Sequence, residues 1–124
     1  MKRILVVDDE EDTVRLTQRI LETEGFEVVG CNSGNKALDW VQNNYNDISL
    51  ILLDIMMPGK SGFEVLKSIK TDEKLKSITV ILFTIKNFNE DLQKAKKLGA
   101  DGYLIKPFSG TQLISYIKEK LSVN

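Results

Sequence analysis

Five polar residues stand at the ends of short apolar runs, where their side chains could do chemistry together. They are Asp8, Asp9, Asp54, Thr84 and Lys106. Carboxylates brought close together raise one another's pKa unless a cation compensates their charge. Oxygen ligands favour a hard ion, and a site with few protein ligands and several waters favours Mg²⁺ over Ca²⁺. With a lysine and a hydroxyl donor nearby, such a site suits one carboxylate to receive a phosphoryl group, because positive charge neutralises the transferring oxygens.

These residues can meet only if the apolar runs before them lie side by side. Runs 4–7, 50–53 and 80–83 are continuously apolar, which is typical of strands that are covered on both faces. Segments 27–30 and 102–105 are weaker strand candidates and are expected toward the edges of the sheet.

Amphipathic segments separate the strand candidates. Their apolar positions recur at helical spacing: Val14, Thr17 and Leu21; Ala37, Leu38 and Val41; Phe63, Leu66 and Ile69; Leu92, Ala95 and Leu98; and Leu113 or Ile114 with Ile117 and Leu121. Ser33 is expected to cap the second helix, and Gly25 and Gly99 to end the first and fourth. Strand and helix alternate five times, which predicts an α/β fold with a parallel sheet and helices on both faces. No linker divides the chain, so one domain, 1–124, is expected.

Composition excludes several classes of function. The 124 residues are 42% hydrophobic with a net charge of −1, so a core can form and a strong general nucleic-acid binder is not expected. The chain has no histidine and one cysteine, Cys31, which excludes histidine-dependent nucleophiles, most zinc sites and an intrachain disulfide. No apolar run is long enough to cross a bilayer and the start is unlike a signal peptide, so a soluble cytoplasmic protein is expected.

The polar residues are expected at one edge of the sheet. In open α/β sheets, ligands bind beyond the carboxyl ends of the strands, where the direction of winding reverses. Each residue alone has an ordinary explanation. Acids at 8–12 suit the start of a helix, Asp54 suits a turn, Thr84 suits a strand, and Lys106 suits the surface. The functional interpretation therefore depends on their occurring together at successive strand ends.

Four stretches together resemble the receiver domains of two-component response regulators. Their sequences are ILVVDDE, LILLDIMMPGKSGFEVL, VILFT and GADGYLIKPF, and the resemblance covers essentially the whole chain, with particular similarity to single-domain receivers of the chemotaxis type. The resemblance implies a flavodoxin-like (βα)5 fold, doubly wound, with five parallel strands in the order 2-1-3-4-5. It also implies a phosphorylatable signalling switch that catalyses only its own phosphorylation and dephosphorylation.

The resemblance assigns roles to the acidic residues. Asp54 is expected to be the phosphoacceptor and a ligand of Mg²⁺. Asp9 is expected to bind the ion directly, and Asp8 to hold it mainly through water. The backbone carbonyl of Met56 is expected to complete the protein ligands.

The resemblance also implies a conformational switch. Thr84 is expected to hydrogen-bond the phosphoryl group, and Lys106 to pair with it. The bond between Lys106 and Pro107 is expected to be cis, which would aim the lysine into the site. Tyr103 is expected to change rotamer when Thr84 moves inward, which would alter the surface of the fourth helix, fifth strand and fifth helix.

Two bulky residues depart from the family's usual pattern or crowd the acceptor. Ile85 follows the threonine, where the family usually has a small residue, and Met56 is a large apolar residue two positions after Asp54. Both are expected to hinder the attacking water and bulky donors. The sequence therefore predicts a relatively long-lived phosphoryl group and slow transfer.

The expected partners follow from the missing histidine. A phosphorelay needs a phosphohistidine, so a sensor histidine kinase or a phosphotransfer protein must donate, and acetyl phosphate could also serve. A downstream effector protein is the expected target, with no direct contact to nucleic acid or membrane. No arginine follows Arg19, which weakens a dimer paired by arginines on the last helix, so a monomer or weak dimer is expected.

Other interpretations have specific requirements. A phosphohydrolase with an aspartate nucleophile would need an acid at position 56, and an FMN binder would need a Ser/Thr/Gly-rich loop in place of the acids at 8–11. Two alternatives keep the receiver fold. One is an interaction module with little or no phosphorylation, and the other is the receiver part of a larger regulator.

Overall fold

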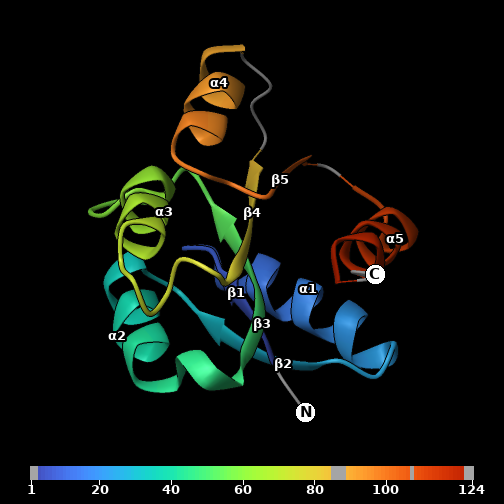
Figure 1. Cartoon of the computed structure of the whole chain (residues 1–124). Coiled ribbons are helices and arrows are strands. Elements are labelled where there is room, and N and C mark those ends of the chain that lie inside the picture. The colour runs from blue at the N-terminus through green and yellow to red at the C-terminus, as the bar shows by residue number, and fades with distance from the viewer. Residues whose placement is uncertain (1–2, 85–88, 107, 122–124) are drawn as a thin grey trace.

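Strands and helices alternate along the whole chain in the computed structural model, which describes residues 3–84, 89–106 and 108–121 (Figure 1). The strands are β1 (Arg3–Val7), β2 (Glu27–Cys31), β3 (Ile48–Asp54), β4 (Thr79–Thr84) and β5 (Gly102–Ile105). The helices are α1 (Glu11–Thr23), α2 (Gly34–Asn44), α3 (Gly62–Lys70), α4 (Asn89–Lys97) and α5 (Gly110–Leu121), with a short 3₁₀ turn, η1 (Tyr45–Asp47). This succession confirms the predicted α/β fold class.

The five strands form one parallel sheet. Their order is β2-β1-β3-β4-β5, which confirms the doubly wound order 2-1-3-4-5. Residues 4–7, 50–53 and 80–83 of the three central strands are completely buried. The two weaker candidates, β2 and β5, form the edges. Since the winding reverses between β1 and β3, the fold places a binding site at the carboxyl ends of these strands.

Helices cover both faces of the sheet. α1 and α5 lie on one face, and α2, α3 and α4 lie on the other (Figure 1). Side chains alternate along β1, so Ile4 and Val6 pack under α1 and α5, whereas Leu5 and Val7 pack under the other three helices. This explains why the central strands are continuously apolar. No helix in the described ranges is both long and apolar enough to cross a membrane.

Local signals fix the ends of the helices. The Ser33 side chain accepts a hydrogen bond from a backbone N–H in the first turn of α2, which confirms the predicted cap. Ser61 and Glu64 form a reciprocal capping box that starts α3 directly after the β3 loop. Gly25 and Gly99 follow α1 and α4 with φ of +90° and +94°, a conformation that favours glycine at helix ends.

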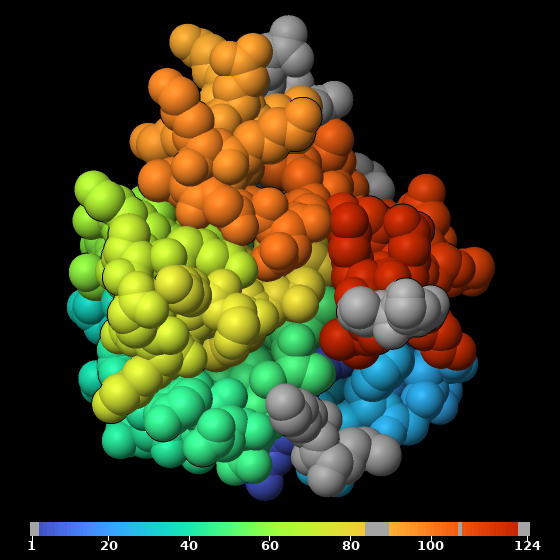
Figure 2. Space-filling model, in the orientation of Figure 1, coloured from blue at the N-terminus to red at the C-terminus, as the bar shows by residue number. Residues whose placement is uncertain are grey.

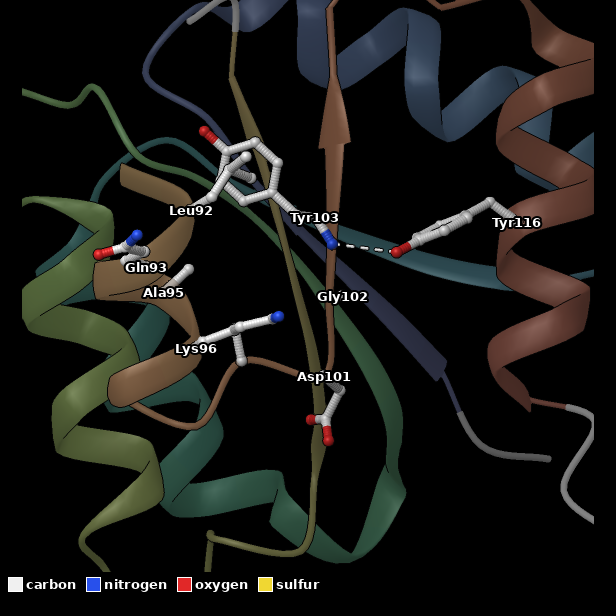
Figure 3. A pocket seen from close by; sticks show the side chains of 9 residues that line it. Leu92, Gln93, Ala95, Lys96, Asp101, Gly102, Tyr103 and Tyr116 are labelled. Carbon is white, nitrogen blue, oxygen red and sulfur yellow. Dashed lines mark hydrogen bonds between the residues drawn. The ribbon is translucent and has the colours of Figure 1, made fainter. Parts of the chain in front are cut away.

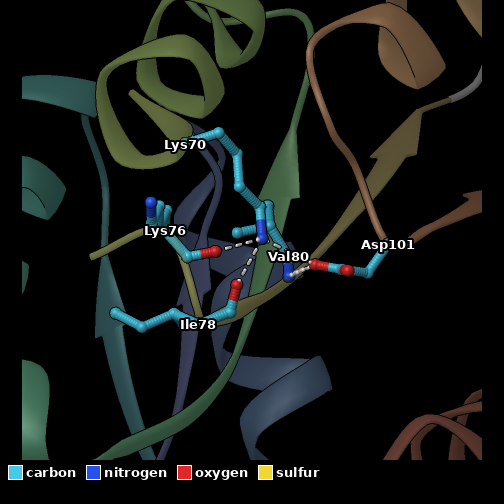
Figure 4. Close-up of polar contacts among 5 residues, drawn as sticks. All are labelled: Lys70, Lys76, Ile78, Val80 and Asp101. Carbon is cyan, nitrogen blue, oxygen red and sulfur yellow. Dashed lines mark hydrogen bonds and ion pairs between the residues drawn. The ribbon is translucent and has the colours of Figure 1, made fainter. Parts of the chain in front are cut away.

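A lysine, Lys70, holds together the segments at the amino end of β4 (Figure 4). The Lys70 ammonium at the end of α3 donates to the carbonyl oxygens of Lys76 (3.0 Å) and Ile78 (2.7 Å). It also donates to Oδ2 of Asp101 at 2.9 Å, and the same oxygen accepts the N–H of Val80 at 2.8 Å. These bonds tie α3, the start of β4 and the turn before β5 together.

Candidate functional site

Asp8 and Asp9 follow β1 and lie before the first turn of α1. Asp8 is fully buried, whereas Asp9 is exposed. The Asp8 N–H donates to the carbonyl of Cys31 (3.1 Å), and its Oδ1 accepts the N–H of Glu10 (3.0 Å). Because α1 begins only at Glu11, Asp8 and Asp9 are not ordinary first-turn acids of a helix.

Asp54 is the last residue of β3 and lies beside Phe83 of β4. Its side chain is buried, with 5% of the residue exposed, and its Oδ1 accepts the N–H of Met56 at 3.4 Å. Gly62 lets the following loop return onto the strand end, because a Cβ there would overlap the carbonyl oxygen of Asp54. The Gly62 N–H donates to the carbonyl of Ile55 (3.0 Å), which closes the loop.

The three predicted acids converge. Carboxylate oxygens of Asp8, Asp9 and Asp54 lie within 4.8 Å of one another. Burial is the main reason that the pKa of Asp54 rises from 3.8 to about 7, and the charge of Asp8 adds to the rise. Lys106 and the N–H of Met56 lower this pKa, but they do not offset burial. Among the described residues three carboxylates thus share this site, and a cation there would offset their like charges.

Lys106 enters the same cluster from the end of β5. Its ammonium is 2.7 Å from Oδ2 of Asp8 and 3.9 Å from Oδ2 of Asp54, and its side chain is 15% exposed. The structure therefore brings together four of the five residues predicted from the sequence, from the ends of β1, β3 and β5. Lys106 forms its shorter contact with Asp8 and not with the predicted acceptor.

Two aromatic residues of the site were not singled out from the sequence. The Lys106 ammonium lies 4.7 Å from the ring centroid of Phe83, and the rings of Phe83 and Phe108 pack with centroids 6.1 Å apart. Their positions offered a signal, since Phe83 directly precedes Thr84 and Phe108 follows Lys106 by two residues. A buried aromatic residue in a central strand is usually core packing, so the pattern alone does not distinguish the two roles.

Several predicted details fall outside the described residues. Thr84 ends β4 beside Ile105, which places its backbone at the rim, but its side chain is not among those described. Ile85 and the predicted cis bond to Pro107 also lie outside the described residues. Met56 is 50% exposed, as a residue facing the rim would be. Its carbonyl as a metal ligand stays a prediction.

Tyr103 lies on the edge strand β5, between α4 and α5 (Figure 3). Its N–H donates to the hydroxyl of Tyr116 on α5 at 3.0 Å, and its half-buried ring points toward Leu92 on α4. Burial, and then the charge of Asp91, raise the pKa of the Tyr103 hydroxyl. A hollow of about 460 Å³ is lined by these two helices and β5, and Figure 2 shows the orange segment that contains α4 and β5 on the same face as α5 (red).

Comparison with known proteins identifies the class. The model of the response regulator receiver domain family matches residues 4–118, and the chain belongs to this family. It is therefore a receiver domain of two-component signal transduction, a class of signalling switch. This confirms the resemblance seen in the sequence.

Particular relatives agree with this class. The chain is 37% identical over 118 residues to the transcriptional regulatory protein CpxR of Escherichia coli (strain K12), covering 95% of this chain and 48% of CpxR. It is 39% identical over 122 residues to the response regulator SaeR of Staphylococcus aureus (strain USA300), covering 98% and 51%. The chain thus spans about half the length of the curated relatives it matches.

Solved structures agree with the fold. The chemotaxis protein CheY4 of Vibrio cholerae superposes with a TM-score of 0.90 at 28% identity, over 96% of this chain and 98% of that one. A CheY-like receiver domain protein from Methanospirillum hungatei JF-1 gives 0.90 at 33% identity, over 98% and 94%. These neighbours support the flavodoxin-like arrangement.

Proposed function

We propose that this receiver domain, taken as one domain over 1–124, is a switch that accepts a phosphoryl group on Asp54. The observation that carries the proposal is the convergence of three carboxylates and one ammonium at the rim where the sheet reverses its winding. A buried aspartate at the end of a rigid strand has a fixed oxygen, which suits in-line attack. The ordinary explanations for each residue do not explain why these acids and this lysine, from three strand ends, lie together.

Mg²⁺ is the cofactor that the residues fit best. Among the described residues one ammonium accompanies three carboxylates, and the charge of Asp8 adds to the effect of burial in raising the pKa of Asp54. Asp9, Asp54 and the carbonyl of Met56 would hold the ion, and Asp8 would hold it mainly through water. All of these donors are oxygens, which matches a hard divalent cation. When bound, the ion supplies positive charge beside the phosphoryl oxygens.

Three residues of the chain have different roles in the transfer of the phosphoryl group. One oxygen of Asp54 attacks phosphorus while the bond from phosphorus to the donor's imidazole nitrogen breaks, and the electron pair leaves with the imidazole. Lys106 pairs with a phosphoryl oxygen, for which it needs to move only from Asp8 toward Asp54. The Thr84 hydroxyl donates to another phosphoryl oxygen. Asp54, Thr84 and Lys106 are thus the residues that contact the phosphoryl group during the transfer.

The signal then spreads from Thr84 to the face formed by α4, β5 and α5. Movement of Thr84 toward the phosphoryl group would make room for the Tyr103 ring, which is half-buried in the present structure. The hollow lined by α4 and β5 would change shape as a result. Phosphorylation acts here by biasing two conformations that already exist. Tyr103→Ala is expected to leave phosphorylation intact and to weaken binding of the effector.

The partners are a donor and an effector. The chain has no histidine, so a sensor histidine kinase or a phosphotransfer protein supplies the phosphoryl group. A downstream effector protein binds the face formed by α4, β5 and α5. The chain acts as a monomer or weak dimer at a cytoplasmic location. The name of CpxR describes a transcriptional regulator. For the present chain we propose no direct contact with nucleic acid or membrane.

A receiver portion of a larger regulator is the second candidate. The chain's coverage of about half of its curated relatives favours considering it. It would change the output that the switch controls but not the chemistry of Asp54. An interaction module without phosphorylation is not favoured, because it would not need the clustered acids and Lys106.

The proposal is tested with Mg²⁺ and beryllofluoride, which mimics an acyl phosphate. Backbone amide NMR shifts of the β5 and α4 residues should change in the native chain when both are added, and not in Asp54→Asn. Asp39→Asn, a change at an exposed acid on α2, is the matched control and should respond like the native chain. A response that survives Asp54→Asn would contradict the assignment of the acceptor.

A further inference from the structure

We propose that Phe83 is a positioning residue of this site, whose ring face keeps the Lys106 ammonium within reach of both Asp8 and Asp54. The inference rests on the proposed function, since it concerns the lysine that would pair with the phosphoryl group. Three groups that the structure describes lie close to the ammonium: Oδ2 of Asp8 at 2.7 Å, Oδ2 of Asp54 at 3.9 Å and the Phe83 ring centroid at 4.7 Å. Of these three, the ring is the uncharged neighbour.

The position of the Phe83 ring is rigid relative to the acceptor. Phe83 is completely buried on β4 and pairs in register with Asp54 on β3. Its carbonyl accepts the N–H of Ile55 at 3.3 Å, which ties it to the residue after the acceptor. The ring of Phe108 packs against it at an interplanar angle of 52°. A lysine resting on this ring is therefore placed by the strand that lies beside Asp54.

The uncharged Phe83 ring can hold the Lys106 ammonium even when the carboxylates bind a cation. Lysine has a long flexible stem, and ordering it costs rotamer entropy. Asp8 holds Lys106 in the present structure, but a cation on the acidic cluster would weaken that attraction. The ring attracts an ammonium through its quadrupole and needs no share of a carboxylate. Lys106 would thus stay in the site while its charged partner changes from Asp8 to a phosphoryl oxygen.

Burial strengthens the contact between the ring and the ammonium. Cation–π attraction is greatest where water is excluded. The Lys106 side chain is 15% exposed and Phe83 is completely buried, so the contact is largely shielded from solvent. Packing alone would require an apolar side chain under the lysine stem, but it would not require an electron-rich face under the ammonium.

A second lysine–phenylalanine contact provides a matched control. The Lys94 ammonium on α4 lies 4.6 Å from the ring centroid of Phe63 on α3. Phe63 is also buried, with 9% exposed, and belongs to the core on the other face of the sheet from Phe83. Phe63→Leu therefore removes a similar side chain and a similar contact without touching Lys106.

Proton NMR of the metal-free protein tests the contact itself. Protons above an aromatic ring are shifted upfield, so the Lys106 methylene protons beside the ammonium should resonate upfield of ordinary lysines. Phe83→Leu should return them to ordinary positions, and Phe63→Leu should leave them unchanged. Identical Lys106 resonances in the native chain and Phe83→Leu would overturn the proposal.

Ring fluorination tests the positioning role. Replacing Phe83 with mono-, di- and trifluorophenylalanine withdraws electron density from the ring face with little change in volume, so the fold is retained. The rate of phosphorylation by acetyl phosphate with Mg²⁺ should fall stepwise along this series. The rate should be about three- to thirtyfold lower for Phe83→Leu, the range from an exposed to a shielded cation–π contact, and unchanged for Phe63→Leu.

The two proposals fail in different ways. If the native chain takes no phosphoryl group on Asp54, the proposed function is wrong, and the positioning role falls with it even where NMR shows the contact. If Asp54 is phosphorylated at a rate that does not depend on fluorination, the proposed function stands and the role of Phe83 is packing alone.

Discussion

Two lysine–aspartate contacts lie at opposite ends of the strands, and they differ in how completely the charges are paired. Lys70 and Lys106 have similar side-chain exposure, 13% and 15%. Lys70 donates three hydrogen bonds, and its partner Asp101 also accepts the N–H of Val80 (Figure 4). Lys106 instead contacts Asp8 and Asp54, two of the three carboxylates that cluster among the described residues.

The difference separates a structural contact from a binding site. At Lys70 each donor has a partner, so the contact fixes α3 and β4 and needs nothing further. At Lys106 the cluster retains excess negative charge, and the pKa of Asp54 rises to about 7 as a result of burial and of Asp8. A buried cluster in this condition gains stability from an added cation, so it is suited to binding one.

The largest expected effect is on phosphorylation by acetyl phosphate. Lys106→Met should slow phosphorylation of Asp54 by about 100-fold or more, because it removes a charge that stabilises the transferring oxygens. Lys70→Met should leave the rate within about twofold of the native rate, since Lys70 only holds together the segments at the amino end of β4. Rates are measured by mass spectrometry at a fixed Mg²⁺ concentration. Equal losses in both variants would contradict the distinction.

The next effect is on the free energy of unfolding. Lys70→Met should lower it by about 2 kcal/mol, because the Ile78 carbonyl and Asp101 lose a shared donor. Lys67→Met, an exposed change one turn earlier on α3, is the control and should change little.

The gain in stability on adding Mg²⁺ should differ between the two lysine variants. A ligand that binds only the folded state stabilises it, so Mg²⁺ should stabilise the native chain and Lys70→Met by the same amount, because both retain the acids. The gain should be larger for Lys106→Met, in which the ion replaces the lost ammonium charge beside Asp8 and Asp54. Urea unfolding with Mg²⁺ and with EDTA measures each gain, and an equal gain in all three proteins would contradict the account.

The fold follows from sequence patterns that need no three-dimensional information. Continuous apolar runs predict the central strands because each of their faces packs under helices, as Ile4 and Leu5 show. Parallel topology then forces the carboxyl ends together, which is why Asp8, Asp54 and Lys106 could be placed in one site before the structure was known. The difference between fully buried Asp8 and exposed Asp9 could not be predicted, because both follow the same strand.

Contacts that depend on side-chain reach could not be predicted. The Lys70–Asp101 pair joins residues 31 apart along the chain. Neither residue has a pattern that distinguishes it from a surface charge. Phe83 fits the apolar pattern of a central strand, and that pattern does not indicate which ring lies under an ammonium.

A smaller effect is expected from the charge of Asp54 without metal. The folded pKa of about 7 lies above the ordinary 3.8, so the folded state holds this proton more tightly. The contribution of Asp54 to stability is therefore present at low pH and is lost as pH rises from about 4 to about 7. Asp54→Asn should stabilise the protein by about 1–2 kcal/mol at pH 8 and have little effect near pH 4.

Urea unfolding in EDTA at the two pH values provides this measurement. Asp101→Asn is the comparison at the far edge and should destabilise at pH 8, because it weakens the pairing with Lys70. Destabilisation by Asp54→Asn at pH 8 would show that the acidic cluster is already satisfied without a cation.

The smallest effect concerns access to the acceptor. Ile85→Ala should speed both phosphorylation and loss of the phosphoryl group by roughly threefold, because it replaces the bulky residue that directly follows Thr84 in the sequence with a small one. Both rates are followed by mass spectrometry after addition and removal of acetyl phosphate. Unchanged rates would mean that Ile85 does not limit access.

The most direct test is chemical identification of the acceptor. Borohydride reduces an aspartyl phosphate to homoserine, which sequencing by mass spectrometry locates within the peptide. After incubation with acetyl phosphate, we predict homoserine at position 54, formed with Mg²⁺ and not with EDTA, and nearly absent from Lys106→Met. Homoserine at position 8 or 9, or no homoserine in the native chain with Mg²⁺ present, would contradict the account.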